Sequence, residues 1–317
     1  MKERNSTIDI FKAILLFSAI ISNFLHKIGD PNPYINYILY SYHMPLFLAI
    51  SGYLLSSFTL SLSLKEFTKK YIIRIFIPFC FAWIIFFLFW YYQNISPYTI
   101  IRNIIYPMFH LWYVYNFLFS IYFIFILKKL KVTDETILYI GIGISIFIII
   151  LITRCIQFSL IITLIQPYYL GFFTFGYYIR QKKLNIKKEN ISIFGIIIGI
   201  VWIIHIFLAP KYNFKKITIT FIFLNFLMII FVLSICFHYP NPTPNKKNKI
   251  LEWIGKNSYP IYLWHPIIPT FIQYLHLLII YTWIIAIIGL ISLLICIYYL
   301  SKITWINKYI FGNNVKD

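Results

Sequence analysis

Ionisable and amide side chains interrupt the first apolar run of the chain, residues 8–26, which contains Asp9, Lys12, Asn23 and His26. An ionisable group at mid-membrane costs about 2.5–3.5 kcal/mol to insert, so it usually faces the protein interior and has a function. Lys12 and Asn23 return to nearly the same face of a helix, which turns about 100° per residue. The run therefore predicts a helix with one polar stripe, although the same residues also fit simple anchoring at its two ends.

A second apolar run carries His43 beside Pro45, well inside residues 34–56. Proline has no backbone N–H, so it frees a carbonyl one turn earlier in a helix. Imidazole changes charge near neutral pH, which suits proton transfer next to such a break. A structural histidine bonded to a neighbouring helix is the other interpretation. Gly52, further along, favours close approach of another helix.

The composition predicts an integral membrane protein. Of its 317 residues, 61% are hydrophobic and 12% are charged, whereas a soluble domain has about 25% charged residues. We expect an all-α polytopic bundle of about ten transmembrane helices forming one domain over residues 1–317. Residues 240–256, the longest hydrophilic connection, read as a loop. The expected spans are 8–26, 34–56, 71–93, 104–127, 137–153, 158–180 (broken by Pro167 and Gly171), 192–209, 217–238, 258–277 and 280–300.

The distribution of basic residues predicts that both termini are cytoplasmic. With an inner N-terminus, the inner segments hold 21 lysines and arginines, the outer segments hold 6, and Lys12 completes the total of 28. Positive residues concentrate on the cytoplasmic side of membrane proteins. The same placement explains the net charge of +19 without nucleic acid as a partner.

Several chemistries lack their sequence signals. The four cysteines stand singly in apolar runs, so neither a zinc site nor a disulfide framework is predicted, and we expect no metal. The chain has no Walker loop, which argues against an ATP-driven pump. It also has no HExxH and no GxSxG motif.

Other polar groups recur at the expected helix ends. Lys70 and Arg74 are four residues apart at the inner surface, where they fit either an orientation signal beside anionic lipid or a phosphate-binding patch. His110-Leu111-Trp112-Tyr113 lies near the outer end of its span. Ser258 is a plausible helix N-cap, which places His265 about two turns in from the cytoplasmic face.

Four ordered blocks of the sequence resemble acyltransferase family 3. They are Ile8-Asp9-x-x-Lys12, HMPLFxxxSGYL at 43–54, LWY at 111–113 and IGKNSYPIYLWH at 254–265. The resemblance covers nearly the whole chain. It implies a multi-pass protein of the bacterial inner membrane that moves an acyl group, usually acetyl, from cytoplasmic acyl-coenzyme A to a hydroxyl of an envelope polysaccharide or glycolipid. Acyl-coenzyme A would be a donor substrate, and no bound cofactor is implied.

The resemblance also implies roles for individual residues. Lys12, Lys70 and Arg74 would bind the anionic donor, and Trp112, Tyr113, Ser258 and His265 would line the substrate pathway. Family members carry a basic residue followed, after ten intervening residues, by a catalytic histidine. Lys12 matches the basic residue, but Asn23 occupies the position of the histidine.

An asparagine amide cannot act as a general base near neutral pH, although it can orient a substrate or donate to an oxyanion. Three interpretations remain open. His26, one turn further out, replaces the histidine; His43 in the HMPLF block is the base; or acyl transfer is lost. In the last case the chain is a degraded family member, or a transporter or export component that handles glycans or acyl groups.

Overall fold

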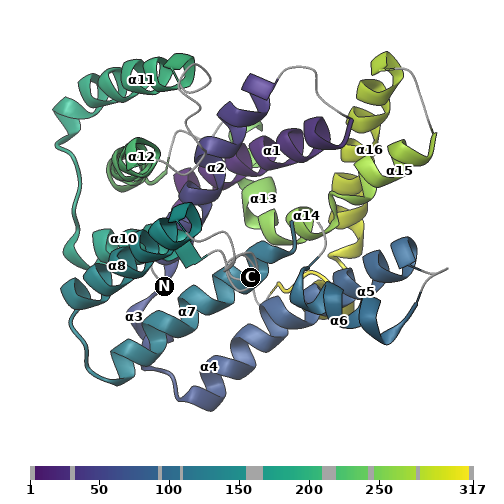
Figure 1. Cartoon of the computed structure of the whole chain (residues 1–317), viewed down its shortest axis with the longest axis horizontal. Helices are drawn as coiled ribbons and strands as arrows, with labels where there is room; N and C mark the ends of the chain where they lie inside the picture. The colour runs from purple at the N-terminus through teal and green to yellow at the C-terminus, as the bar shows by residue number, and fades with distance from the viewer. Residues whose placement is uncertain are drawn as a thin grey trace. The chain divides into compact units, whose positions relative to one another are not determined.

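The computed structural model describes residues 4–28, 33–91, 95–107, 110–154, 167–208, 219–241, 246–275 and 279–313. Within these ranges 87% of residues are helical and none forms a strand, which confirms the all-α prediction (Figure 1).

Six helical stretches in the described ranges are long and apolar enough to cross a membrane. They are Ser6–Leu25, Leu64–Tyr91, Asp134–Leu151, Lys188–Phe207, Thr220–His238 and Tyr281–Leu300. These stretches overlap six of the ten expected spans and support a membrane protein. The total of ten spans and the cytoplasmic placement of both termini stay predictions.

The described residues divide into two compact units, which we treat separately. Unit 1 comprises residues 1–55, 130–145 and 169–256, and unit 2 comprises residues 56–129, 146–168 and 257–317. The helices of unit 1 are α1 (Ser6–Ile28), α2 (Pro33–Leu54), α10 (Leu170–Lys182), η4 (Lys188–Asn190), α11 (Ile191–Leu208), α12 (Ile219–His238) and α13 (Lys246–Lys256). Helix α8 (Asp134–Arg154) begins in unit 1, and its later residues belong to unit 2.

The helices of unit 2 are mostly shorter. They are α3 (Ser57–Ser61), α4 (Leu64–Tyr71), the π-helical turn η1 (Ile72–Phe76), α5 (Ile77–Tyr91), α6 (Pro97–Ile105), α7 (Trp112–Lys129), α14 (Ser258–Trp264), α15 (Ile267–Leu275), α16 (Ile279–Leu300) and α17 (Thr304–Tyr309). Helix α14 packs against α5 and α16, and α17 packs against η1.

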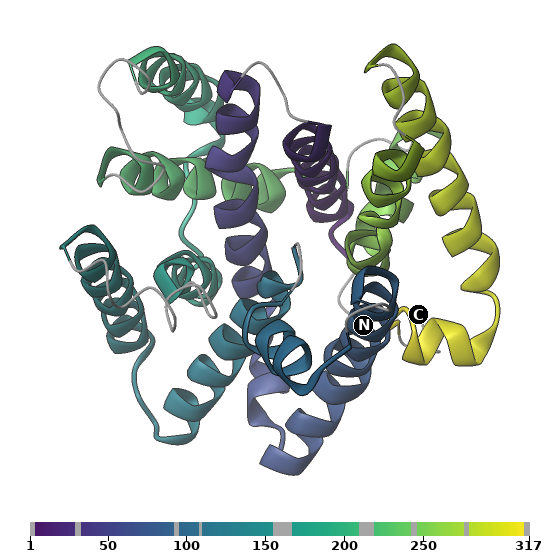
Figure 2. The same cartoon turned by 45° about the vertical axis from the view of Figure 1, so that its right-hand side comes forward.

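Helix α2 is central to unit 1, where it packs against α1, α10 and α12 (Figure 2). A Cβ on Gly52 would lie 2.0 Å from the carbonyl oxygen of Phe173, and a Cβ on Gly176 would lie 1.9 Å from that of Ala49. Both distances are far below van der Waals contact. The close approach expected at Gly52 is therefore confirmed, and Gly176 on α10 supplies its counterpart.

Two expected spans are interrupted. Residues 104–127 contain the end of α6 and the start of α7, because Tyr106 precedes Pro107 and takes a non-helical conformation with φ −115° and ψ 84°. Residues 258–277 divide into α14 and α15 at His265 and Pro266. In the expected span 158–180, a 3₁₀ turn (η3, Pro167–Tyr169) leads into α10, and the residues before Pro167 lie outside the described ranges, so the break at Pro167 stays a prediction. The break expected at Gly171 is wrong, because Gly171 lies within α10.

The loop prediction for residues 240–256 is wrong over Lys246–Lys256, which forms α13, and residues 242–245 lie outside the described ranges. Leu251, Ile254 and Gly255 follow the i, i+3, i+4 spacing of one helix face, and the last two are buried. Helix α13 packs against α1. The lysines and asparagines of this segment favoured a loop in the sequence analysis. The helix buries its apolar face against α1, a contact that local sequence does not reveal.

Prolines within a helix or just after one leave carbonyls that side chains from other helices bind. Pro45 lies within α2 and cannot donate to the carbonyl of Ser41, which accepts a hydrogen bond of 3.0 Å from Nδ2 of the fully buried Asn225 on α12. In unit 2, Pro107 likewise leaves the carbonyl of Asn103, which accepts from Trp83 Nε1 at 3.1 Å.

We predict that Asn225→Leu destabilises the protein by about 1–3 kcal/mol, because a buried carbonyl loses its donor. In a Pro45→Ala background the same change should cost less, since the new N–H at position 45 can bond to Ser41. Thermal unfolding of the wild type, the two single variants and the double variant in detergent measures this coupling. Equal costs in both backgrounds would contradict the assignment of Asn225 to the carbonyl that Pro45 frees.

Candidate functional site

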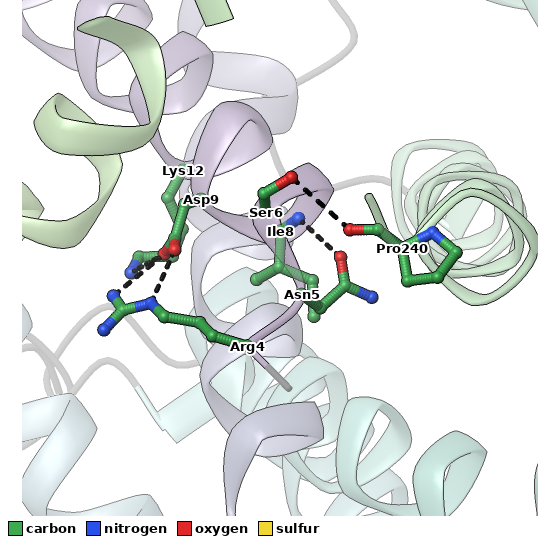
Figure 3. Close-up of polar contacts among 7 residues, drawn as sticks. All are labelled: Arg4, Asn5, Ser6, Ile8, Asp9, Lys12 and Pro240. Atoms are coloured by element: carbon green, nitrogen blue, oxygen red, sulfur yellow. Dashed lines mark hydrogen bonds and ion pairs between the residues drawn. The ribbon is translucent and has the colours of Figure 1, made fainter. Parts of the chain in front are cut away.

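A buried carboxylate organises the start of α1 (Figure 3). Asp9, whose side chain is 4% exposed, accepts hydrogen bonds from Arg4 Nε at 2.7 Å and Nη2 at 3.2 Å, and from Lys12 Nζ at 3.0 Å. The two cations that bind this carboxylate offset the free-energy cost of burying its charge. Lys12, the residue expected to bind the donor, is therefore already engaged by Asp9, and the cluster keeps one net positive charge.

The first turn of α1 is fixed by the end of α12. Asn5 caps α1 by accepting from the Ile8 N–H at 3.1 Å, and its Nδ2 donates to the Cys236 carbonyl at 2.6 Å. The hydroxyl of Ser6 donates to the carbonyl of Pro240 at 3.5 Å (Figure 3). The N–H of Thr7 donates to the same carbonyl at 3.2 Å. Unpaired donors at one helix start thus meet acceptors at another helix end, which fixes the position of Asp9.

Gly255 brings two of the sequence blocks into contact. A Cβ at this position would lie 1.8 Å from the backbone oxygen of Asp9. Only glycine therefore allows α13 to approach the α1 backbone so closely. Asp9 of the block beginning at Ile8 and Gly255 of the block beginning at Ile254, 246 residues later in sequence, are therefore in close contact within unit 1.

The three sequence-predicted catalytic positions lie on two helices of unit 1. Asn23 is half-buried on α1. His26 falls within α1, but its side chain lies outside the described residues. His43 is buried, its Nδ1 lies 2.5 Å from the carbonyl of Leu39, and its ring meets those of Tyr40 and Tyr42 edge-on. A carbonyl can only accept, so Nδ1 carries the proton and Nε2 carries the lone pair.

Lys70 and Arg74 lie at the junction of α4 and the π-helical turn η1, in unit 2. They are close enough for their charges to interact, and neither has a carboxylate within ion-pair distance in the described ranges. Lys70 Nζ donates to Thr59 Oγ1 at 2.9 Å. Single π turns are frequent at functional sites, and this one presents two uncompensated cations.

Two distant segments hold η1 in place. Tyr259 Oη donates to the carbonyl of Ile75 at 2.6 Å. Gly312 adopts φ +69°, and a Cβ there would lie 2.0 Å from the carbonyl oxygen of Arg74. The left-handed conformation and the close contact both require glycine. The position of Arg74 is therefore set by packing from both sides.

The predicted pocket residues of unit 2 are brought together in part. The ring of Tyr113 lies 5.2 Å from that of Tyr262, whose ring is 5.8 Å from that of His265. Trp112 is half-buried beside Tyr113. The prediction that Ser258 is the N-cap is wrong by one position, because Asn257 is the N-cap of α14 and Ser258 is its first residue. Asn257 makes no side-chain capping bond, and Ser258 is buried.

Sequence reasoning missed His110 and Tyr262 as site residues. The rings of His110 and His265 lie 4.7 Å apart, although the sequence assigned them to different depths of the membrane. Tyr262 Oη donates to the carbonyl of His110 at 2.5 Å. Each histidine stands next to a helix interruption, at the start of α7 and the end of α14, and that shared position is the signal that could have paired them.

We predict that Gly255→Ala lowers the unfolding temperature by an amount equivalent to about 1–3 kcal/mol, because the added methyl group forces α13 away from Asp9. Gly199→Ala on α11 is the matched control, since a Cβ there meets nothing within 4 Å. The control should be neutral or slightly stabilising. Equal unfolding temperatures for the two variants in detergent would refute the Asp9–Gly255 contact.

Comparison with known proteins gives one clear match. The acyltransferase domain of acyltransferase family 3 matches residues 5–302, nearly the whole chain. Searches of curated proteins and of solved structures find no match. The matched range includes the Asp9 cluster, the π turn and the histidine pair.

Proposed function

The chain belongs to acyltransferase family 3, and on that premise we propose that it moves an acyl group, most simply acetyl, from cytoplasmic acyl-coenzyme A to a hydroxyl of a cell-envelope glycan. The family match across residues 5–302 carries the proposal, because it supplies the reaction class. The apolar helices support a membrane location, and we propose the bacterial inner membrane.

The uncompensated cations of unit 2 support an anionic donor. Lys70 and Arg74 present two positive charges, and arginine binds phosphate oxygens through paired N–H donors. The phosphates of coenzyme A suit such a site. Lys12, whose charge is largely balanced by Asp9, contributes less directly: we propose that it keeps the start of α1 weakly positive.

The glycan acceptor is proposed to enter along the aromatic side chains of unit 2. Trp112 and Tyr113 begin α7, while Ser258 and His265 bound α14. Buried aromatic groups with polar edges can hold a sugar by contact and hydrogen bonding. In unit 1, Asn23 can donate to an oxyanion, and His43 or His26 as the base stays a prediction.

We predict that the purified protein in lipid nanodiscs transfers radiolabelled acetyl from acetyl-coenzyme A to total surface glycan. The variants His43→Ala, His26→Ala and Asn23→His assign the sequence-predicted positions. Loss in His43→Ala or His26→Ala identifies a required histidine, and a gain in Asn23→His shows that the amide limits the rate. No labelling by any of the four proteins would contradict acyl transfer.

We predict that Arg74→Ala weakens binding of coenzyme A by roughly 10- to 100-fold, because one charge-assisted hydrogen bond to phosphate contributes about 1.5–3 kcal/mol. Lys69→Ala is the matched control, since Lys69 is exposed in the preceding turn. Isothermal titration of the nanodisc protein measures both affinities. Unchanged affinity in Arg74→Ala would remove this residue from the donor site.

The second candidate function is a transporter or export component for a glycan or an acylated glycan. Asn23 at the position of the family's catalytic histidine favours it. Such a protein would bind or move the glycan and would leave acyl-coenzyme A intact. Consumption of acetyl-coenzyme A therefore separates the two functions.

A further inference from the structure

His110 is a buried imidazole in unit 2 whose nitrogens have no hydrogen-bond partner. The residue is 4% exposed, and neither Nδ1 nor Nε2 forms a hydrogen bond with any described residue. The backbone of Tyr262 and Leu263 lies close enough to the ring to interact with it, although neither contact has the geometry of a well-formed hydrogen bond. An unsatisfied buried polar atom costs about 1–3 kcal/mol, which is a large expense for a side chain with a packing role alone.

The neighbouring His265 has a defined tautomer because of a proline. Pro266 has no N–H, so it cannot donate to the carbonyl of Tyr262 one turn earlier. His265 Nδ1 lies 2.7 Å from that carbonyl. The carbonyl can only accept, so Nδ1 carries the proton, and the basic lone pair is on Nε2. A neutral imidazole fixed in this way is suited to accept a proton.

Tyr262 links the two histidines. Its hydroxyl donates to the His110 carbonyl, its own carbonyl accepts from His265, and its ring lies 4.5 Å from that of His110. The His110 carbonyl also accepts the N–H of Tyr113 at 3.1 Å. The start of α7 is thereby fixed to α14, which holds the imidazole rings 4.7 Å apart.

Further unsatisfied groups belong to the same unit. Ser120 Oγ on α7, Trp264 Nε1 on α14 and Thr270 Oγ1 on α15 are buried without a hydrogen-bond partner among the described residues. Ser120 lies seven residues after Tyr113, which places both on one face of α7. The helices next to the histidine pair therefore carry hydroxyl and N–H groups that a polyhydroxylated ligand would satisfy.

We propose that His110 and His265 form the proton-accepting pair for the acceptor hydroxyl, with Tyr262 as the positioning residue. The inference rests on the proposed acyl transfer and assigns the role of base to His110 in place of the sequence-predicted His43 and His26. The hydroxyl gives its proton to a neutral imidazole nitrogen of His110, and its oxygen forms the ester bond to the acyl carbon. The carbon–sulfur bond of acyl-coenzyme A breaks, and the leaving thiolate takes the proton from the imidazolium.

Initial rates of acetyl transfer to surface glycan test the pair. His110→Gln should lower kcat about 100-fold or more, within the range for removal of a general base, with the KM for acetyl-coenzyme A unchanged. His205→Gln is the matched control, because His205 is a buried histidine of α11 in unit 1. The control should keep its rate within about twofold of the wild type.

Imidazole rescue separates chemistry from packing. Added imidazole should restore part of the rate of His110→Ala and leave His205→Ala unchanged. His265→Asn retains an N–H near the Tyr262 carbonyl but lacks a basic nitrogen, so it should fold normally and remain slow.

The outcomes distinguish this inference from the proposed function. No transfer by the wild type overturns the proposed function and the inference together. Wild-type transfer that persists in His110→Gln overturns the inference alone. A loss in His110→Ala without imidazole rescue, accompanied by a lower unfolding temperature than that of His205→Ala, also overturns it, because the ring would then be needed only for packing.

Discussion

Prolines within helices or just after them impose the constraint on which this structure depends. Each removes one backbone N–H, and an unpaired carbonyl within a membrane is costly because no water can replace the donor. Asn225 binds the carbonyl that Pro45 frees, Trp83 binds the one that Pro107 frees, and His265 binds the one that Pro266 frees. In the third case the donor is an imidazole, so satisfying the backbone also fixes a tautomer.

The Asp9 cluster solves a related problem with charges. A carboxylate buried at the start of α1 takes two cations, and the helix start is fixed by the carbonyls that end α12. Gly255 then admits α13 to the backbone of Asp9. Polar groups of unit 1 are thus largely satisfied by its own helices, whereas His110 of unit 2 keeps two nitrogens without partners in the described ranges.

Local sequence predicted much of the fold and part of the site. Hydropathy predicted the apolar helices, and Gly52 behaves as local chemistry requires. Sequence analysis did not predict α13, whose apolar face is buried only by packing against α1. It also did not predict the helix break at Tyr106. Most of all it could not bring His110 to His265: their proximity depends on two helix interruptions and on Tyr262 joining them, which are tertiary facts. The sequence predicted that Lys12 binds the anionic donor, and it did not predict the ion pair that Lys12 forms with Asp9.

The most direct test of the account is whether His110 belongs to a site that ligands can reach. Diethyl pyrocarbonate acylates neutral imidazole nitrogens, and mass spectrometry of the nanodisc protein can map each modified histidine. The account predicts that His110 is modified in the folded protein faster than His205, and that surface glycan slows this modification. Reaction of His110 only after unfolding in detergent would show a sealed packing residue and would contradict the account.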